Sequence, residues 1–296
     1  MPAVKYLDFS SLVSVVVATR ESYSTKGGTI ELVLRWLEVS EERPIQLVIA
    51  ENSGDGFDRQ RLLTHLDEYS YPFQIDVVLC DTNVGAARNK AADKALGDII
   101  VFIDDDTIPI GSGMISNLAT RSLSYSHGYG AVRYWTPFIG IDEQVKATLD
   151  KHIIARDHSK IMGCGCLPTG EIRFKDTEES EYLSRSFIGN FGFVRRNAFI
   201  LVGGFPESFD GYGLEDDALM LMLYQEVGPP GILDDLSILH ISHHSADLLK
   251  YGGEYNRSRY HQFYKRYGIS NFHIGDLLFR RGGGRPVLVR EDKDGV

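Results

Sequence analysis

The chain has 296 residues, of which 43% are hydrophobic, so it can bury a full core as one large domain or as two closely packed subdomains. Its 41 acidic residues outnumber its 31 basic residues, and the net charge of -10 argues against general nucleic-acid binding, which needs a basic surface. The apolar runs are much shorter than a bilayer span and the N-terminus lacks an export signal, so we expect a cytoplasmic protein without a transmembrane segment.

Strands and helices alternate through the first 135 residues. Apolar, β-branched runs predict strands, and apolar residues spaced three and four apart predict helices. In chain order the predicted elements are a strand at 12–18, a helix with Ile30, Val33, Leu34 and Leu37 on one face, a strand at 45–50, a helix with Leu62, Leu63, Leu66 and Tyr69, a strand at 73–79, an Ala-rich helix at 85–96 and a strand at 98–103. This alternation predicts an α/β fold with a doubly wound, mostly parallel sheet and helices on both faces.

The pattern is less regular in the second half of the chain. Residues 140–186 are polar and charged and form either a lid or binding segment or a solvated excursion. Order returns with a strand within 187–194, a helix at 215–226, a strand at 231–241 and an aromatic-rich helix at 246–267. We therefore divide one compact domain into halves at 1–135 and 136–267, followed by an extension at 268–296.

Three consecutive acidic residues, Asp104, Asp105 and Asp106, end the strand at 98–103. In an extended segment, alternate side chains point the same way, so Asp104 and Asp106 are expected on one side and Asp105 on the other. Hard carboxylate oxygens suit Mg²⁺ or Mn²⁺ bridging to a diphosphate. The alternative is an N-cap and solvated turn before a helix that starts near Gly111.

Further polar candidates follow the other predicted strands and begin two helices. In a doubly wound sheet the ligand binds at the carboxyl ends of the strands, and Thr19, Arg20, Glu51 and Ser53 follow two predicted strands at that edge. Residues 52–56 are equally consistent with a simple turn that binds no ligand. Gly85 lies at a predicted helix start beside Asn83, where the absent side chain would let an anionic ligand approach the backbone N–H groups. Arg88 in the same helix could bind that anion, and the alternative for Arg88 is an exposed helical arginine. Glu215 and Asp216 begin another helix, where carboxylates either complement the helix dipole or accept a proton.

Five motifs together resemble the inverting glycosyltransferases of the glycosyltransferase-A fold, particularly the large family 2. They are residues 15–20, 51–53, 83–89, 104–106 and 211–217, followed by His240, and the resemblance spans roughly 12–267. It implies a nucleotide-diphosphate sugar as donor, a hydroxyl-bearing acceptor and Mn²⁺ or Mg²⁺ as cofactor. Residues 1–135 are then the donor-binding half and 136–267 the acceptor-binding and catalytic half. A lipid-linked acceptor would place the protein peripherally at a membrane.

The resemblance also implies a role for each candidate residue. Asp216 is the candidate general base, and Glu215 orients the acceptor. Asp106 binds the metal directly, with Asp104 on the ribose or a metal-bound water and with His240, or one of the nearby His243 and His244, completing the site. The donor contacts are assigned to Thr19, Arg20, Glu51, Ser53, Asn83, Gly85, Arg88, Asp104 and Asp105, although the family usually has Asp where this chain has Glu51.

Two other classes of function remain open from the sequence. A sugar-phosphate nucleotidyltransferase shares the doubly wound sheet and strand-end aspartates, but its Gly-rich basic loop is poorly matched here, with only Arg20 and Lys26 near the first strand. The second class is a non-catalytic protein that binds a sugar nucleotide or a carbohydrate. Retention of the anomeric configuration also stays open, because a fold does not determine stereochemistry.

Overall fold

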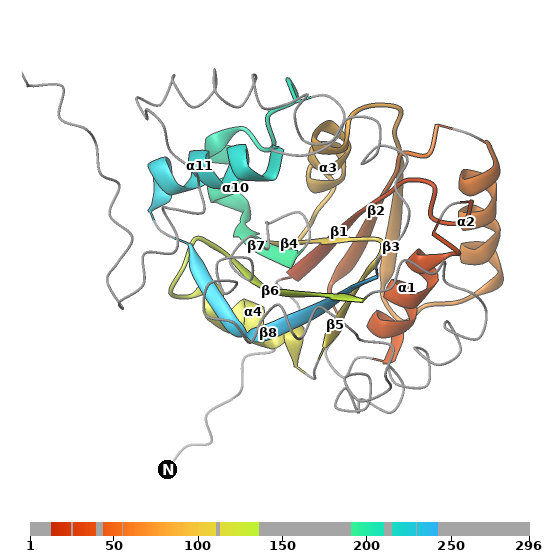
Figure 1. The fold of residues 1–296 in the computed structure, drawn as a ribbon, viewed down its shortest axis with the longest axis horizontal. Coiled ribbons are helices and arrows are strands. Elements are labelled where there is room, and N and C mark those ends of the chain that lie inside the picture. The colour runs from red at the N-terminus through yellow and green to blue at the C-terminus, as the bar shows by residue number, and fades with distance from the viewer. Residues whose placement is uncertain are drawn as a thin grey trace, which may run out of the picture.

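The computed structural model describes residues 13–24, 26–39, 44–54, 56–110, 113–135, 191–209, 215–228 and 230–241. These residues form one mixed sheet of eight strands with helices packed on both faces (Figure 1). The segment 140–186, the predicted helix at 246–267 and the extension at 268–296 lie outside the described residues. Within the described part of the chain, no helix is long and apolar enough to cross a membrane.

Four parallel strands make the first half of the sheet, as the sequence predicts. They are β1 (Val13–Thr19), β2 (Gln46–Glu51), β3 (Gln74–Leu79) and β4 (Ile99–Asp104), in the order β3-β2-β1-β4. β1 pairs with both β2 and β4, which places Thr19 beside Glu51 and Ala18 beside Asp104. The strand-end side chains predicted to face a ligand therefore lie along one edge.

The second half of the sheet adds strands of both directions. β7 (Gly192–Arg195) runs antiparallel to β4 and to β6 (His127–Trp135), β6 runs parallel to β8 (Gly231–Ile241), and β8 runs antiparallel to β5 (Thr107–Ile110). The sequence analysis did not predict β5 and β6. β5 is too short to show periodicity, and it exists because the chain turns back after Asp106 and pairs with β8.

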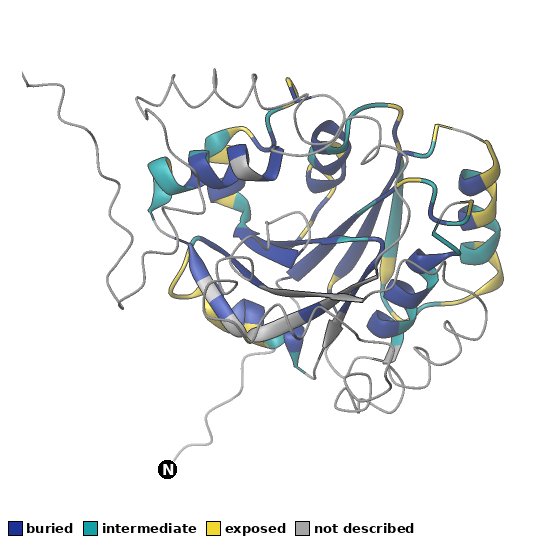
Figure 2. Cartoon of the chain, in the orientation of Figure 1, coloured by how far each residue is buried: buried dark blue, intermediate teal, exposed yellow. Residues whose placement is uncertain are grey.

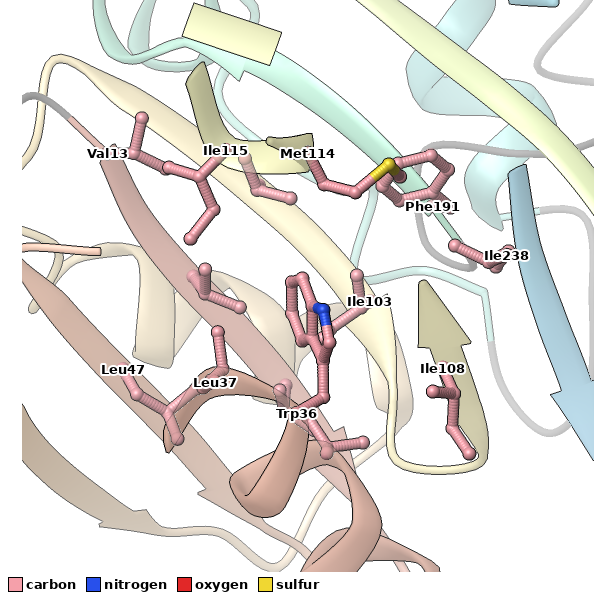
Figure 3. Packing of buried hydrophobic residues seen from close by; sticks show 14 of the residues in the cluster. Val13, Trp36, Leu37, Leu47, Ile103, Ile108, Met114, Ile115, Phe191 and Ile238 are labelled. Carbon is pink, nitrogen blue, oxygen red and sulfur yellow. The ribbon is translucent and has the colours of Figure 1, made fainter. Parts of the chain in front are cut away.

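Two hydrophobic cores lie on opposite faces of the sheet. β-strand alternation sends Val13, Val15 and Val17 to one face and Val16 to the other. The first face packs against α1 (Thr29–Val39), α2 (Gly56–Glu68) and α4 (Met114–Ser122) (Figure 3), and the second against α3 (Val84–Ala92), α10 (Arg196–Val202) and α11 (Glu215–Val227). Both faces of the central strands are therefore buried, and exposed residues gather on the outer helices (Figure 2).

One predicted helix is shorter than expected. The Ala-rich segment was predicted to be helical over 85–96, but α3 ends at Ala92 with Asp93 as its C-cap. The backbone N–H groups of Leu96 and Gly97 donate instead to Gln46 Oε1 at 2.9 Å and Ser14 Oγ at 2.9 Å. The Gln46 and Ser14 side chains thus supply the hydrogen-bond acceptors that helical carbonyl groups would supply if the helix continued.

Candidate active site

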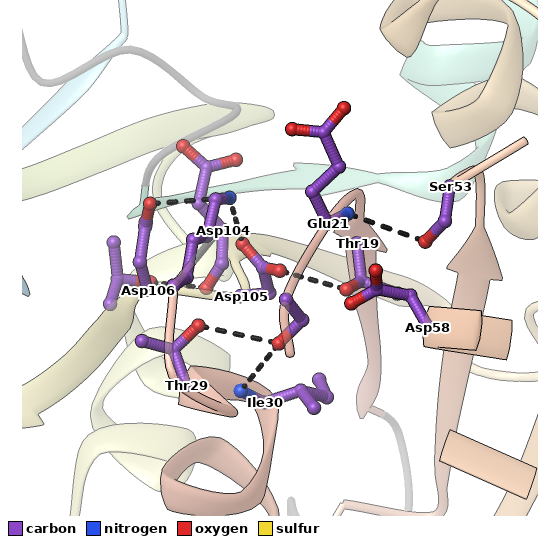
Figure 4. A network of polar contacts seen from close by, with 12 residues as sticks. Thr19, Glu21, Thr29, Ile30, Ser53, Asp58, Asp104, Asp105 and Asp106 are labelled. Carbon is purple, nitrogen blue, oxygen red and sulfur yellow. Dashed lines mark hydrogen bonds and ion pairs between the residues drawn. The ribbon is translucent and has the colours of Figure 1, made fainter. Parts of the chain in front are cut away.

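The acidic triplet marks the end of β4 and the start of a turn. Asp105 accepts hydrogen bonds from Thr19 Oγ1 at 2.7 Å and from Lys26 Nζ at 2.6 Å, and Asp106 Oδ2 lies 3.4 Å from the same ammonium (Figure 4). Asp104 instead pairs with Arg88. The expectation that Asp104 and Asp106 share one side, opposite Asp105, is therefore wrong: Asp105 and Asp106 share Lys26, because β4 ends at Asp104 and the chain turns through the next two residues.

Burial and charge act together on this cluster. Asp105 is 1% exposed and Asp106 3% exposed. Burial raises the pKa of the Asp105 carboxyl, and the positive charge of Lys26 opposes that rise. For Lys26, burial favours the neutral amine, but the charges of Asp105 and Asp106 outweigh it and raise the pKa of the ammonium. The two carboxylates therefore hold a charged lysine at the sheet edge.

Arg88 joins the acidic triplet to the second acidic cluster. Its Nη2 donates to Asp104 Oδ1 at 2.7 Å, and its Nη1 donates to Glu215 Oε1 at 3.1 Å and Asp216 Oδ1 at 3.2 Å. The guanidinium also lies over the ring of Phe205, 5.3 Å from its centroid. Arg88 is 3% exposed, which excludes the alternative of an exposed helical arginine. One side chain thus brings together carboxylates from β4 and from the start of α11.

The charges around Arg88 are stabilised by each other. Burial disfavours the guanidinium, yet the negative charges of Asp216, Asp104 and Glu215 raise the pKa of Arg88 further above its usual range. Asp216 is 8% exposed and Glu215 5% exposed, so both carboxylates are largely desolvated. A buried ionised carboxylate needs such a partner, because burial without one favours protonation. The arrangement gives Asp216 a positively charged partner that is shared with Asp104 of the triplet.

The candidate nucleoside contacts lie beside β1 and β2. Glu51 is buried, forms an ion pair with Arg59 on α2 and accepts a hydrogen bond from the Ser53 N–H at 2.8 Å. Ser53 Oγ accepts from the Glu21 N–H at 3.3 Å, whereas the Arg20 side chain is 57% exposed. Arg59 was not identified from the sequence, since nothing in its local pattern distinguishes it from other helical arginines.

Asn83 and Gly85 shape the start of α3. The Asn83 side chain accepts from the Ala86 N–H at 2.8 Å and donates to the Glu207 carbonyl at 3.0 Å. A Cβ at Gly85 would lie 3.3 Å from Phe205 Cβ, so the missing side chain permits close packing of α3 against the 205–206 turn. These contacts hold the helix that carries Arg88. A direct contact of either residue with a donor stays a prediction.

His240 lies next to the triplet along the sheet. The β5–β8 register pairs Thr107 with His240, so the histidine backbone is adjacent to the residue that follows Asp106. His243 and His244 fall outside the described residues. Among the residues that are described, no three His, Cys, Asp or Glu side chains are grouped as ligands of one ion. The oxygen ligands available here nevertheless fit a hard divalent cation, because the buried carboxylates of Asp105 and Asp106 already bind one positive group, the Lys26 ammonium.

Comparison with known proteins identifies the chemistry. Residues 14–136 match the family model of glycosyl transferase family 2, and residues 173–227 match the model described as the N-terminal domain of galactosyltransferase. Residues 14–136 therefore resemble a glycosyl transferase family 2 domain. No curated protein sequence matches it. The family match favours glycosyl transfer over nucleotidyl transfer and over a purely binding role.

Solved structures share the fold of this glycosyltransferase at low identity. A structure of S. aureus TarS 1-349 in complex with UDP-GlcNAc is 13% identical with a TM-score of 0.54, covering 90% of this chain and 70% of that one. A second structure of S. aureus TarS is 14% identical with a TM-score of 0.50, covering 90% of this chain and 42% of that one. GalNAc-T7 with UDP, GalNAc and Mn²⁺ is 14% identical with a TM-score of 0.52, covering 86% of this chain and 48% of that one. These likenesses support the glycosyltransferase-A fold.

Proposed function

We propose that this glycosyltransferase moves a sugar from a nucleotide-diphosphate sugar to a hydroxyl acceptor, with inversion, using a divalent cation and Asp216 as the general base. The observation that carries the proposal is the Arg88 guanidinium, which bonds to Asp104 on the donor side and to Glu215 and Asp216 on the other. Two acidic clusters that are distant in sequence thereby face one site. A transfer reaction needs this arrangement, because the leaving group and the attacking hydroxyl meet at one carbon atom.

The donor side is assigned to the first half of the chain, residues 1–135. We assign Asp106, Asp104 and His240 to a Mn²⁺ or Mg²⁺ ion, and the donor itself to Thr19, Arg20, Glu51, Ser53, Asn83, Gly85, Arg88 and Asp105. Bound there, the ion stabilises the negative charge of the leaving nucleoside diphosphate. GalNAc-T7, which shares the fold, holds Mn²⁺ together with UDP, and TarS holds UDP-GlcNAc; both support a divalent ion and a UDP-sugar here.

The acceptor side is assigned to residues 136–267. Asp216 takes the proton of the acceptor hydroxyl as that oxygen bonds to the anomeric carbon and the carbon–oxygen bond to the diphosphate breaks. Attack from the face opposite the leaving group inverts the anomeric configuration. Glu215 lies beside Asp216 on the same guanidinium and orients the acceptor. Arg88 places its positive charge beside both carboxylates.

The proposal is tested by turnover of the purified protein. A screen of sugar nucleotides, with and without Mn²⁺, measures release of free nucleoside diphosphate and identifies the donor before the acceptor is known. With donor and acceptor in hand, NMR of the product reads its anomeric configuration. Retention of configuration would refute the single displacement, and no release from any donor in either condition would refute the transferase itself.

The role of Asp216 has its own test with a matched control. Asp216→Asn removes the proton acceptor with little change in shape, and we expect kcat to fall by ~10²–10⁴-fold, as for loss of a general base. Glu226→Gln removes an exposed carboxylate from the same helix, α11, and is expected to leave kcat unchanged. Wild-type kcat in the Asp216→Asn variant would assign the base elsewhere.

A further inference from the structure

A lysine from the loop between β1 and α1 lies within the acidic triplet. Lys26 Nζ is 2.6 Å from Asp105 Oδ1 and 3.4 Å from Asp106 Oδ2, and its side chain is only 15% exposed (Figure 4). Arg88 makes another cationic contact to the triplet, with Asp104. The proposed metal ligand Asp106 thus already has a cation beside it.

The loop that carries Lys26 is held by side chains on three sides. Asp58 on α2 accepts from the N–H groups of Tyr23 and Ser24, and Ser53 Oγ accepts from the N–H of Glu21. Ser22 Oγ accepts from the Ile30 N–H at 3.1 Å, which ties the loop to the start of α1 (Figure 4). So many fixed contacts indicate that the fold positions the lysine at the carboxylates and that it is not a solvated surface charge.

Gly27 and Gly28 give the loop its final turn. They have φ values of +68° and +80°, a region that residues with a side chain rarely adopt. The Gly28 N–H donates to the Ser22 carbonyl at 2.6 Å, which closes the loop onto α1. The pair follows Lys26 directly and lets its side chain turn back toward the sheet edge.

An ammonium and a divalent cation cannot occupy the same carboxylate oxygens. Two positive ions a few ångströms apart repel strongly in a buried site, where the effective dielectric constant is far below that of water. Lys26 has four rotatable methylene groups, so it can leave the carboxylates without movement of its backbone. A diphosphate bound to the ion would lie within reach of the displaced ammonium.

We propose that Lys26 exchanges partners during donor binding: it neutralises Asp105 and Asp106 in the empty site, and it contacts the donor diphosphate once a divalent cation has taken over the carboxylates. This inference rests on the metal site assigned in the proposed function. It makes Lys26 a donor-binding residue that also weakens binding of the free ion. Loading of ion and donor together is therefore favoured over loading of the ion alone.

The test measures two affinities that should change in opposite directions. Free Mn²⁺ is titrated by electron paramagnetic resonance without donor, and inorganic pyrophosphate is titrated by calorimetry with Mn²⁺ at saturation. In Lys26→Met we expect Mn²⁺ to bind ~10-fold more tightly, because no ammonium competes for the carboxylates. We expect pyrophosphate to bind ~10-fold more weakly, because the ammonium that would contact it is gone; each change corresponds to about 1.4 kcal/mol. A merely structural lysine would weaken both.

Two control variants accompany it. Lys26→Arg keeps the charge, so it should retain weak Mn²⁺ binding, and Lys90→Met removes an exposed lysine on α3 and should change neither affinity. Unchanged Mn²⁺ affinity in Lys26→Met, or weaker binding of both ligands, would overturn the proposal. The same holds if neither wild type nor variant binds Mn²⁺.

A measurement on the wild type covers the case in which Lys26→Met fails to fold. With ¹⁵N-labelled lysine, a hydrogen-bonded buried ammonium gives its own NMR signal, and saturating Mg²⁺ should shift or remove that signal. An unchanged signal would refute the exchange. The donor-turnover screen separates the two ideas: turnover that requires Mn²⁺, combined with an unchanged Mn²⁺ affinity in Lys26→Met, refutes only the role of Lys26, whereas absence of turnover refutes the proposed function.

Discussion

Replacement of Arg88 by Met tests whether one guanidinium holds the two acidic clusters together. The substitution preserves most of the side-chain volume but leaves Asp104, Glu215 and Asp216 without the charge that they share. Removing one partner of a buried ion pair costs about 3–5 kcal/mol. Because Arg88 is 3% exposed and serves three carboxylates, we expect a loss near the upper end of that range. A domain with a typical stability of about 5–15 kcal/mol would remain folded but weakened.

The assay is urea unfolding followed by circular dichroism at pH 7.5 and at pH 5. Buried carboxylates without a counter-ion bind protons more readily in the folded than in the unfolded state. The folded variant therefore gains stability relative to wild type as the pH falls, and the deficit should be largest at pH 7.5 and smaller at pH 5. Arg121→Met, at an exposed site on α4, is the control and should change stability by less than about 0.5 kcal/mol.

Two results would refute this reasoning. An Arg88→Met variant within about 0.5 kcal/mol of wild type would mean that the carboxylates do not depend on the guanidinium. An equal deficit at both pH values would assign the loss to the contact of Arg88 with the Phe205 ring, which does not change between these pH values.

Three further predictions concern the scaffold. Burial lowers the pKa of His127 to about 3, so the unfolded chain binds a proton that the folded protein excludes; stability should fall by about 1.4 kcal/mol per pH unit as the pH drops below ~6.5, and His127→Leu should flatten that slope in urea unfolding. An identical slope in the variant would contradict this. A Cβ at Gly128 would lie 2.4 Å from a carbonyl oxygen of the neighbouring strand, so Gly128→Ala should lower the unfolding free energy by about 1–3 kcal/mol, whereas Gly56→Ala, with open space around it, should not. Asp58→Ala should speed amide hydrogen exchange of the loop N–H groups that it accepts from, and Asp67→Ala, on the exposed face of α2, should leave that exchange unchanged; equal rates in both would show that the loop is held by other contacts.

Local pattern was enough to predict most of the elements around the site. The apolar run at 12–18 predicted a buried strand, and the structure places Val13, Val15 and Val17 in one core and Val16 in the other, as in a central parallel strand. The motif order likewise predicted the glycosyltransferase-A fold, which the family model over 14–136 supports. The strand signal is carried by residues close together in sequence, where spacing translates directly into geometry.

The partners of the charged residues were decided only by the tertiary structure. Nothing near Arg88 in the sequence indicates that it bonds to Asp104 and to Asp216, which lies 128 positions away, or that Lys26 turns back onto Asp105 and Asp106. β5 likewise depends on its antiparallel pairing with β8, which comes from a distant part of the chain. Periodicity records which face of an element is buried, whereas the pairing of buried charges depends on which elements the fold brings together, and desolvation makes those pairings strong once they form.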